Sequence, residues 1–278
     1  MESQQKINLL RVRDFSENFN VIFEFSKQNY KNILKGICYV ILGVFVVAFL
    51  TMGINTQVTD PYELLAIYTG WQMGLGSILS SLISIIISAF VICYMVQYNE
   101  SENGIVSNSS VWSKATGVIL PLIGYGIVYG VIVVIGCVLC LIPGIIVGVY
   151  LIFYSYIYVV ERLSLVDTFK RSWELVTDNW FVTFGVVFII AIAIFLINFL
   201  LGILLSSIGT IGAVFGTDFF MGDIYSYINT LIVNIVSTLL APITTIAIGV
   251  LYYSRRADVD NIEIDQNIDN IGSIGNYE

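Results

Sequence analysis

The stretch Ala115–Val160, ATGVILPLIGYGIVYGVIVVIGCVLCLIPGIIVGVYLIFYSYIYVV, contains no Asp, Glu, Lys or Arg in 46 residues. A transmembrane helix needs about 20 apolar residues, at a rise of about 1.5 Å each, to cross a hydrocarbon core about 30 Å thick. The stretch is therefore long enough for two helices. It carries its own break at Ile142-Pro143-Gly144, because proline lacks an amide donor and glycine tolerates the dihedral angles of a tight turn. We predict a helical hairpin that turns at Pro143 and Gly144.

Four further stretches without a charged residue flank this hairpin, and each has room for one helix. The whole chain is 57% hydrophobic and 12% charged with a mean hydropathy of +0.87, whereas a soluble domain has about a quarter of its residues charged. The predicted fold is an all-α polytopic membrane domain with six transmembrane helices. The predicted spans are about 36–53, 71–97, 116–141, 144–160, 180–205 and 225–253.

The basic residues predict the orientation of these spans. All 12 Lys and Arg residues lie before the first span, in the second and fourth loops, or after the last span, and the other three loops contain none. The positive-inside rule therefore places both termini in the cytoplasm of a bacterium, with the chain in its inner membrane. The first 35 residues lack the apolar core of a cleavable signal peptide. Residues 255–278 contain six acidic residues, and we predict that they form a disordered cytoplasmic tail.

Two segments on the basic side have the pattern of amphipathic helices. In residues 1–35 the aromatic residues recur at helical spacing, which is typical of a helix lying in the headgroup layer. In residues 164–178 Ser164 and Asp167 fit a variant of the capping box, and the spacing favours ion pairs from Asp167 to Arg171 and from Lys170 to Glu174. Membrane anchoring is the simpler interpretation, and regulation or partner docking is the alternative. The candidate interfacial anchors are Phe15, Phe19, Phe23, Phe169, Arg171, Trp173 and Trp180.

Small and polar residues follow single faces of the second and sixth predicted spans, and Asn198 is a strong polar group in the fifth. Between helices in lipid, such faces allow close packing and interhelical hydrogen bonds. The alternative is that they form the wall of a polar pathway. The residues concerned are Gly74, Ser77, Ser81, Ser84 and Ser88 in the second span, Asn198 in the fifth, and Asn234 and Thr238 in the sixth.

The residues that most chemistry requires are missing. The chain contains no histidine, which removes the usual general base and metal ligand, and it has neither a phosphate-binding loop nor a dinucleotide fingerprint. Cys137-x-x-Cys140 lies in an apolar helix without a second cysteine pair, so we interpret it as packing. The predicted spans also lack the charged groups that ion-coupled carriers use. We expect no catalytic residue, metal, cofactor or nucleic-acid partner, and we make no prediction of oligomeric state.

One region resembles a known family. The order is Val111-Trp112, the hairpin with Pro143-Gly144, a tyrosine-rich helix ending at Glu161, then TFKRSWEL at 168–175 and Asn179-Trp180. Residues 111–200 resemble the membrane domain attached to some bacterial glycerophosphoryl diester phosphodiesterases, and also stand-alone multi-span proteins of unassigned role. The resemblance implies a fold and a membrane location. It implies no activity, because the chemistry of the fused enzymes is expected in a separate barrel domain that no part of this chain matches.

Three hypotheses for function remain. The first is a non-catalytic inner-membrane protein that organises lipid or a partner complex through its cytoplasmic helices. The second is a transporter or lipid-translocating protein that uses the polar faces of the second and sixth spans. The third is an immunity protein against a toxin or bacteriocin.

Overall fold

The computed structural model describes residues 6–50, 71–216 and 223–262, and the regular elements in these ranges are all helices. They are α1 (Phe15–Leu50), α3 (Trp71–Glu100), α4 (Asn108–Leu139), α5 (Leu141–Tyr150), α6 (Tyr154–Glu161), α7 (Leu165–Thr177), α8 (Trp180–Val214) and α10 (Asp223–Val259). Among the described residues, five stretches are long and apolar enough to cross a membrane: Gly76–Glu100, Asn108–Leu139, Leu141–Glu161, Trp180–Gly212 and Ile228–Val259. The chain has the build of an all-α, multi-pass membrane protein, whereas the count of six spans stays a prediction.

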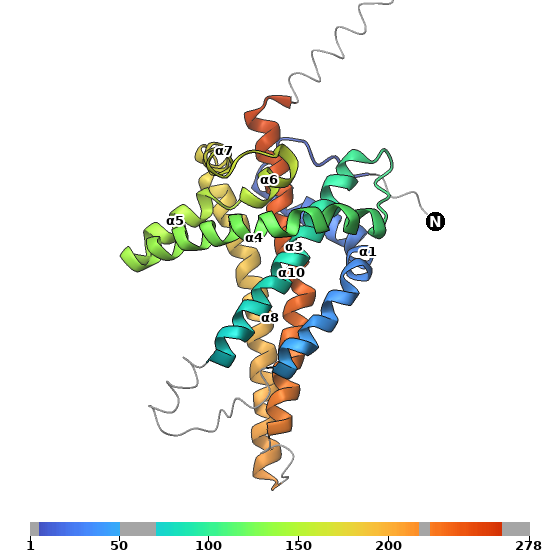
Figure 1. Ribbon diagram of the computed structural model, residues 1–278, viewed down its shortest axis with the longest axis vertical. Helices are drawn as coiled ribbons and strands as arrows, with labels where there is room; N and C mark the ends of the chain where they lie inside the picture. The colour runs from blue at the N-terminus through green and yellow to red at the C-terminus, as the bar shows by residue number, and fades with distance from the viewer. Residues whose placement is uncertain (1–5, 51–70, 217–222, 263–278) are drawn as a thin grey trace, which may run out of the picture.

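The helices form a long stem with a broad head (Figure 1). α8 and α10 pack together as the stem, and α1 and α3 lean against α10 along its upper part. The paired helices α4 and α5 extend sideways from the head, across the direction of α8 and α10. α7 lies beside the end of α10, close to where the described N-terminal segment passes. The segments that carry most of the charge therefore gather at one end of the molecule.

α1 is one continuous helix, so the predicted division at residues 35 and 36, between an amphipathic helix at 1–35 and a span at 36–53, is wrong. No proline interrupts the segment, and Gly36 serves close packing instead of a turn. A Cβ atom at Gly36 would lie 2.1 Å from Cζ of Phe90 on α3, well inside the contact distance of two carbon atoms. Residues 6–14 precede the helix, and residues 51–53 of the predicted span lie outside the described ranges.

The hairpin exists, but its turn lies three residues before the predicted one. α4 ends at Leu139, Cys140 is extended (φ −170°, ψ 141°), and α5 begins at Leu141. Pro143 thus occupies the first turn of α5, where a helix does not need its missing amide. A Cβ atom at Gly144 would lie 2.6 Å from the backbone nitrogen of Cys137, so Gly144 lets the two helices approach closely.

The predicted span 144–160 is also divided, because α5 and α6 are separated by a break at residues 151–153. The core lies beyond this break, where α6 meets α3 and α10. Its largest fully buried side chains include Phe90, Tyr94, Phe153, Tyr156, Tyr252 and Tyr253. The hydroxyl of Tyr156 donates a hydrogen bond to the carbonyl oxygen of Thr245 at 2.8 Å, which satisfies a polar group that would be costly to bury alone.

Candidate functional site

α7 begins as the capping pattern predicts. Ser164 is its N-cap residue, and its hydroxyl oxygen accepts a hydrogen bond from the amide of Asp167 at 3.4 Å. The same hydroxyl donates to Oδ2 of Asp167 at 2.6 Å. The carboxylate in the first turn also favours the helix through its dipole. The cap at the start of α7 is therefore made by residues close together in the sequence.

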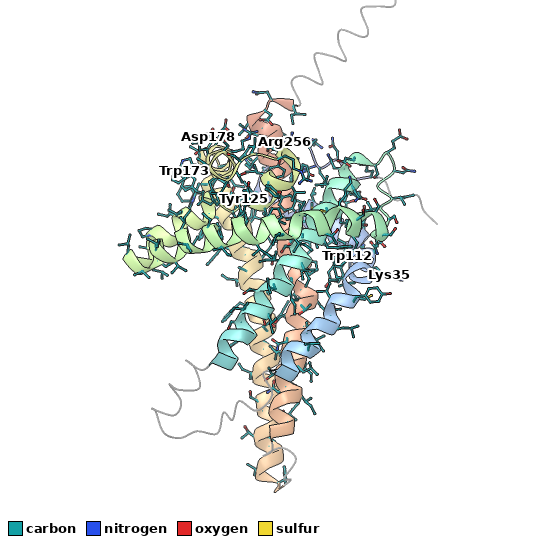
Figure 2. All side chains as sticks on the ribbon, viewed as in Figure 1. Lys35, Trp112, Tyr125, Trp173, Asp178 and Arg256 are labelled. Atoms are coloured by element: carbon teal, nitrogen blue, oxygen red, sulfur yellow. The ribbon has the colours of Figure 1, made fainter. Side chains whose placement is uncertain are left out.

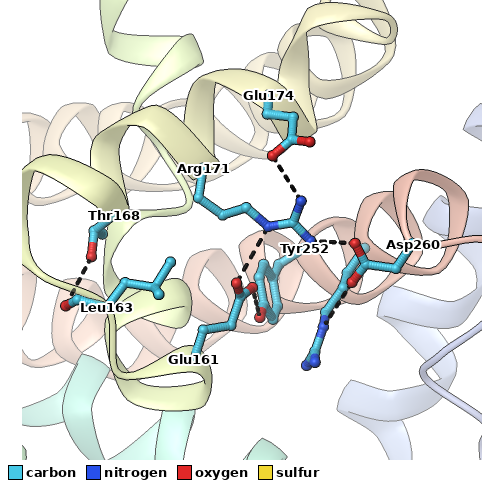
Figure 3. Close-up of polar contacts among 8 residues, drawn as sticks. Glu161, Leu163, Thr168, Arg171, Glu174, Tyr252 and Asp260 are labelled. Atoms are coloured by element: carbon cyan, nitrogen blue, oxygen red, sulfur yellow. Dashed lines mark hydrogen bonds and ion pairs between the residues drawn. The ribbon is translucent and has the colours of Figure 1, made fainter.

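Arg171 holds α7 to two other helices (Figure 3). Its Nε atom lies 3.3 Å from Oε2 of Glu161 at the end of α6, and its Nη1 atom lies 2.8 Å from Oε2 of Glu174. Its Nη2 atom pairs with Asp260, just beyond α10. Burial opposes the charge of Arg171, but the hydrogen bonds that it donates to Glu174 and Asp260, together with the charge of Glu161, hold its pKa above the usual value.

The observed ion pairs of α7 differ from the predicted ones. Arg171 pairs with Glu174 instead of Asp167, and Lys170 approaches Asp167 at 4.0 Å instead of Glu174. The reason is non-local, because Glu161 and Asp260 draw the guanidinium group towards α6 and α10. Arg171 was predicted as an interfacial anchor, but its side chain is only 16% exposed. In this structure it forms ion pairs with three carboxylates.

Ser172 joins α7 to the break between α5 and α6. Its hydroxyl donates to the carbonyl oxygen of Tyr150 at 2.8 Å and accepts from the amide of Phe153 at 3.2 Å. Ser172 is fully buried, so both backbone groups at the break depend on this one side chain. An unpaired buried backbone group costs about 1–3 kcal/mol.

The aromatic anchors of α7 contact protein side chains. The Trp173 ring stacks on Tyr150 with centroids 3.9 Å apart, and Phe169 lies 6.3 Å from Tyr154. Trp173 remains 46% exposed and stands on the outer side of α7 (Figure 2). Within Arg-Ser-Trp-Glu-Leu at 171–175, the first four residues bond or stack on neighbours and Leu175 is buried. We name residues 150–153, 161, 171–175, 252 and 260 the α7 junction.

Sequence reasoning missed several members of this junction. Tyr252 donates from its hydroxyl to Oε1 of Glu161 at 2.7 Å, and Asp260 binds Arg171 and also lies 3.4 Å from Nε of Arg256. The prediction of a disordered tail from residue 255 is therefore wrong for its first residues, which continue α10 to Val259. The sequence could not predict which residues these single acidic side chains bind, because their partners are far away in the sequence. Residues 263–278 lie outside the described ranges.

The N-terminal segment is tied to the same end of the molecule. The amide of Ile7 donates to the Tyr98 hydroxyl at 2.9 Å, and the amide of Arg13 donates to the Ser254 hydroxyl at 3.1 Å. Arg255 in turn donates to the carbonyl oxygen of Arg13 at 2.8 Å. The segment before α1 is thus hydrogen-bonded to the end of α10 in the head.

The aromatic residues of α1 and α8 form two rows. Phe15, Phe19 and Phe23 follow one another on α1 with ring centroids 6.0 and 5.5 Å apart. On α8 the Trp180 ring stacks on Phe184 at 5.0 Å. The two rows meet at Gly185 of α8, where the missing side chain leaves room for Phe15. A Cβ atom at Gly185 would lie 3.1 Å from Cε2 of Phe15. Phe23 is 64% exposed, so the row on α1 presents aromatic surface outwards.

Three lysines continue the same four-residue row along α1. Lys27, Lys31 and Lys35 are all exposed, and none has a hydrogen-bond or ion-pair partner among the described residues. Lys35 lies on the outer side of α1 (Figure 2). Beyond it the row reaches apolar, outward-facing residues such as Tyr39 and Leu42. The spacing of four was visible in the sequence, but the exposure of the whole row was not.

Some residues of the predicted polar faces of α3 and α10 line one cavity together. A cavity of about 140 Å³ lies between α1, α3 and α10, and Ser84, Asn234 and Thr238 line it together with Ser80 and Ser237. Ser237 also donates to Oδ1 of Asn198 at 2.7 Å, which connects α8 to this group. The other residues of the predicted stripe do not line the cavity. Gly74, Ser77 and Ser81 are exposed, and Ser88 lies 3.3 Å from the Thr245 hydroxyl.

Comparison with known proteins gives one match. No curated protein and no solved structure matches the chain. The profile of a domain of unknown function, DUF7847, matches residues 104–255. This region runs from just before α4 to Arg255, four residues before the end of α10. It contains the hairpin, α8 and all of the α7 junction except Asp260. Because the match covers more than half of the chain, the protein belongs to the DUF7847 family.

Proposed function

We propose that this protein is a non-catalytic protein of the bacterial inner membrane that organises anionic lipid, or a partner complex assembled on it, at the cytoplasmic face. The observation that carries the proposal is the row on α1. Three exposed lysines that have no partner among the described residues follow three aromatic residues and precede apolar surface. Aromatic rings and lysines favour the headgroup layer, and apolar side chains favour the acyl layer. The lysines lie directly before the apolar residues, so this part of the row has the order of groups that a membrane–water boundary requires.

The distribution of charge supports the proposed orientation. All the Lys and Arg residues belong to segments that lie before the first predicted span, in loops two and four, or after the last. In the fold, the ends of α3, α6 and α10 and the described N-terminal segment all belong to the head. A basic end favours the cytoplasmic side. We propose accordingly that both termini are cytoplasmic.

The lysine row has an energetic consequence that can be measured. Each Lys near an anionic leaflet contributes about 1 kcal/mol. Three of them contribute about 3 kcal/mol, which corresponds to a preference of roughly a hundredfold for anionic over neutral lipid at this position. Screening by salt weakens it, since the Debye length is about 8 Å at physiological ionic strength.

The resemblance to the membrane domain of glycerophosphoryl diester phosphodiesterases fits this proposal. That likeness concerns the part of an enzyme that sits in the membrane. A lipid-binding membrane module is a role that such a domain and a stand-alone protein can share. We propose the relationship at the level of the membrane fold only, and no phosphodiesterase activity is carried over.

We expect K27Q/K31Q/K35Q to lose most of its anionic lipid. The purified protein would be exchanged into vesicles of phosphatidylglycerol and phosphatidylethanolamine, and retained lipid would be counted by native mass spectrometry. The loss of three charges predicts a fall in phosphatidylglycerol enrichment of between about tenfold and a hundredfold. High salt should reduce the enrichment of the unsubstituted protein as well.

Two variants serve as controls. K27R/K31R/K35R keeps the charges and should retain the enrichment, while K114Q/K170Q removes two exposed lysines outside the row and should leave it nearly unchanged. Unchanged enrichment in the triple Gln variant would refute the proposal. So would an equal fall in K114Q/K170Q, because it would assign the effect to net charge alone.

The cavity between α1, α3 and α10 favours a second candidate function, passive transport. At about 30 Å³ for each water molecule, its 140 Å³ has room for about five water molecules. That volume suits water-sized solutes and is too small for a lipid headgroup. We expect a cysteine at Ser84, inside the cavity, to react with an impermeant thiol reagent, while one at Ser81, outside it, does not. Protection of both positions would remove this candidate.

A further inference from the structure

One part of the fold has few contacts with the rest of the residues that the structure describes. We name residues 123–150 the arm; it consists of the second half of α4, the turn at Cys140 and α5. The buried residues of α4 are Val111, Ala115, Val118 and Leu122, so all of them precede the arm. In α5 only Gly144, Gly148 and Val149 are buried. Beyond Leu122, the two helices of the arm therefore pack mainly against each other.

The surface of the arm is apolar on all sides. Along α4 the exposed side chains include Ile127, Val131 and Val138, and along α5 they include Ile142 and Ile145. Val138, near the tip, is 81% exposed. A soluble partner would cover one side of such a hairpin and leave the opposite side in water. Lipid acyl chains surround a helix completely, and they are the occupant that this surface fits.

The direction of the arm decides where that lipid lies. The arm extends sideways from the head, whereas α8 and α10 run down the stem (Figure 1). α8 has 35 residues, which is about 52 Å at the rise of an α-helix, more than the roughly 30 Å of a hydrocarbon core. A membrane crossed by α8 and α10 is therefore nearly parallel to the arm. The arm tip then does not reach the far side, where α8 ends and α10 begins.

We infer that the arm lies in the plane of the membrane, among the acyl chains of the cytoplasmic leaflet, and that α1, α3, α8 and α10 are the four crossing helices. The base of the arm supports this depth. Tyr150 at the end of α5 stacks beneath Trp173 of α7, and the Tyr125 hydroxyl donates to the carbonyl oxygen of Leu163 at 3.0 Å. Aromatic residues of this kind gather at the boundary between headgroups and acyl chains.

The turn of the arm is suited to lipid as well. In a bilayer core, every backbone polar group needs a partner within the protein. The amide of Cys140 donates to the carbonyl oxygen of Gly136 at 3.1 Å, and the amide of Gly144 donates to the carbonyl oxygen of Cys140 at 3.4 Å. Pro143 has no amide to satisfy. Two amides at the tip are thus paired within the protein, and Pro143 brings none that needs a partner.

This arrangement agrees with the same charge rule as six spans. If the hairpin of α4 and α5 does not cross the membrane, the chain has two crossings fewer than in the six-span topology. An even number is removed, so α7 and the loop before α4 stay on the same side of the membrane as the termini. Positive charge alone cannot distinguish the two topologies. The position of Cys140 can, because six spans place it at the outer surface and an in-plane arm places it within the inner leaflet.

The test uses a variant that keeps Cys140 as its single cysteine, with Cys38, Cys93 and Cys137 replaced by Ala. An impermeant maleimide would be applied to intact cells and to inverted membrane vesicles. We expect Cys140 to resist labelling from both sides. In the cysteine-free background, F215C at the stem end should label from outside, and K170C on α7 should label only in inverted vesicles. A nitroxide on Cys140 should collide with oxygen and be shielded from a water-soluble nickel complex.

Each other outcome overturns the inference. Labelling of Cys140 in intact cells would show that the hairpin crosses the membrane. Labelling in inverted vesicles at the rate of K170C would place the arm in water. Dipolar coupling between nitroxides at position 140 of two copies would show a second protein molecule in place of lipid. Expression and detergent monodispersity of the single-cysteine variant establish that it is folded before any of these measurements.

Discussion

Replacing Arg171 with alanine is expected to release α7 from the head and to lower the free energy of unfolding by about 2–3 kcal/mol. The guanidinium group is the only cation that contacts Glu161, Glu174 and Asp260 together in the described part of the chain. Breaking a fully buried ion pair costs about 3–5 kcal/mol, and exposed pairs are worth about 0–1 kcal/mol. Arg171 and Glu161 are 16% and 15% exposed, so the expected cost lies between these limits.

Amide hydrogen exchange is the measurement that separates this local effect from a general loss of stability. A loss of 2–3 kcal/mol raises the open population of α7 by about 30- to 150-fold. Amides of α7 should exchange faster by that factor, while those in the middle of α3 should change less. K170A is the matched control, because Lys170 is an exposed neighbour whose contact with Asp167 is 4.0 Å long. Equal protection of α7 in R171A and K170A would contradict the proposed role of Arg171.

A double-mutant cycle tests the partner of Arg171 directly. Glu161 contacts both Arg171 and the Tyr252 hydroxyl, so E161Q alone also weakens the junction. If the two charges act together, R171A/E161Q should cost less than the sum of the single variants. Additive costs would mean that Arg171 acts mainly through Glu174 and Asp260.

The sequence contained the local features of this site but not the contacts between them. The Ser164 cap depends on residues three apart, and the charge-free stretches depend on composition, so both were readable. The α7 junction joins Arg171 to Asp260 and Tyr252 to Glu161 across about 90 positions, and no periodicity marks such pairs. For the same reason, the acidic residues after Arg256 were interpreted as a solvated tail.

The errors in the hairpin and in α1 have a common physical origin. Proline and glycine fit a turn, but proline also fits the first turn of a helix and glycine also fits a close helix contact. Pro143 lies in the first turn of a helix, and Gly36 lies at a close helix contact. A helix in lipid is apolar on every side, so its pattern also cannot reveal its direction. The crosswise path of the arm could be seen only in the fold (Figure 1).

Gly249→Ala is expected to destabilise the protein by about 2–4 kcal/mol, although alanine is the better helix former by about 1 kcal/mol. A Cβ atom at Gly249 would lie 2.3 Å from Oη of Tyr156 and 2.7 Å from Sδ of Met95. Tyr156 is fully buried and its hydroxyl is bonded to Thr245, so the ring has little freedom to move away. Overpacking costs about 1–3 kcal/mol, and a buried hydroxyl that loses its acceptor adds about 1–3 kcal/mol.

The matched control is G202A on α8, where a Cβ atom would meet nothing within 4 Å. This variant gains helix propensity without a clash, so its unfolding temperature should stay the same or rise. Thermal unfolding of both variants in the same detergent compares them, and equal temperatures would contradict the clash at Gly249. Y156L should recover part of the loss in G249A, because the shorter side chain vacates the space that the new methyl group needs. Tyr156 and Gly249 both lie inside the DUF7847 region, so such a recovery would locate the clash in the core of the family domain.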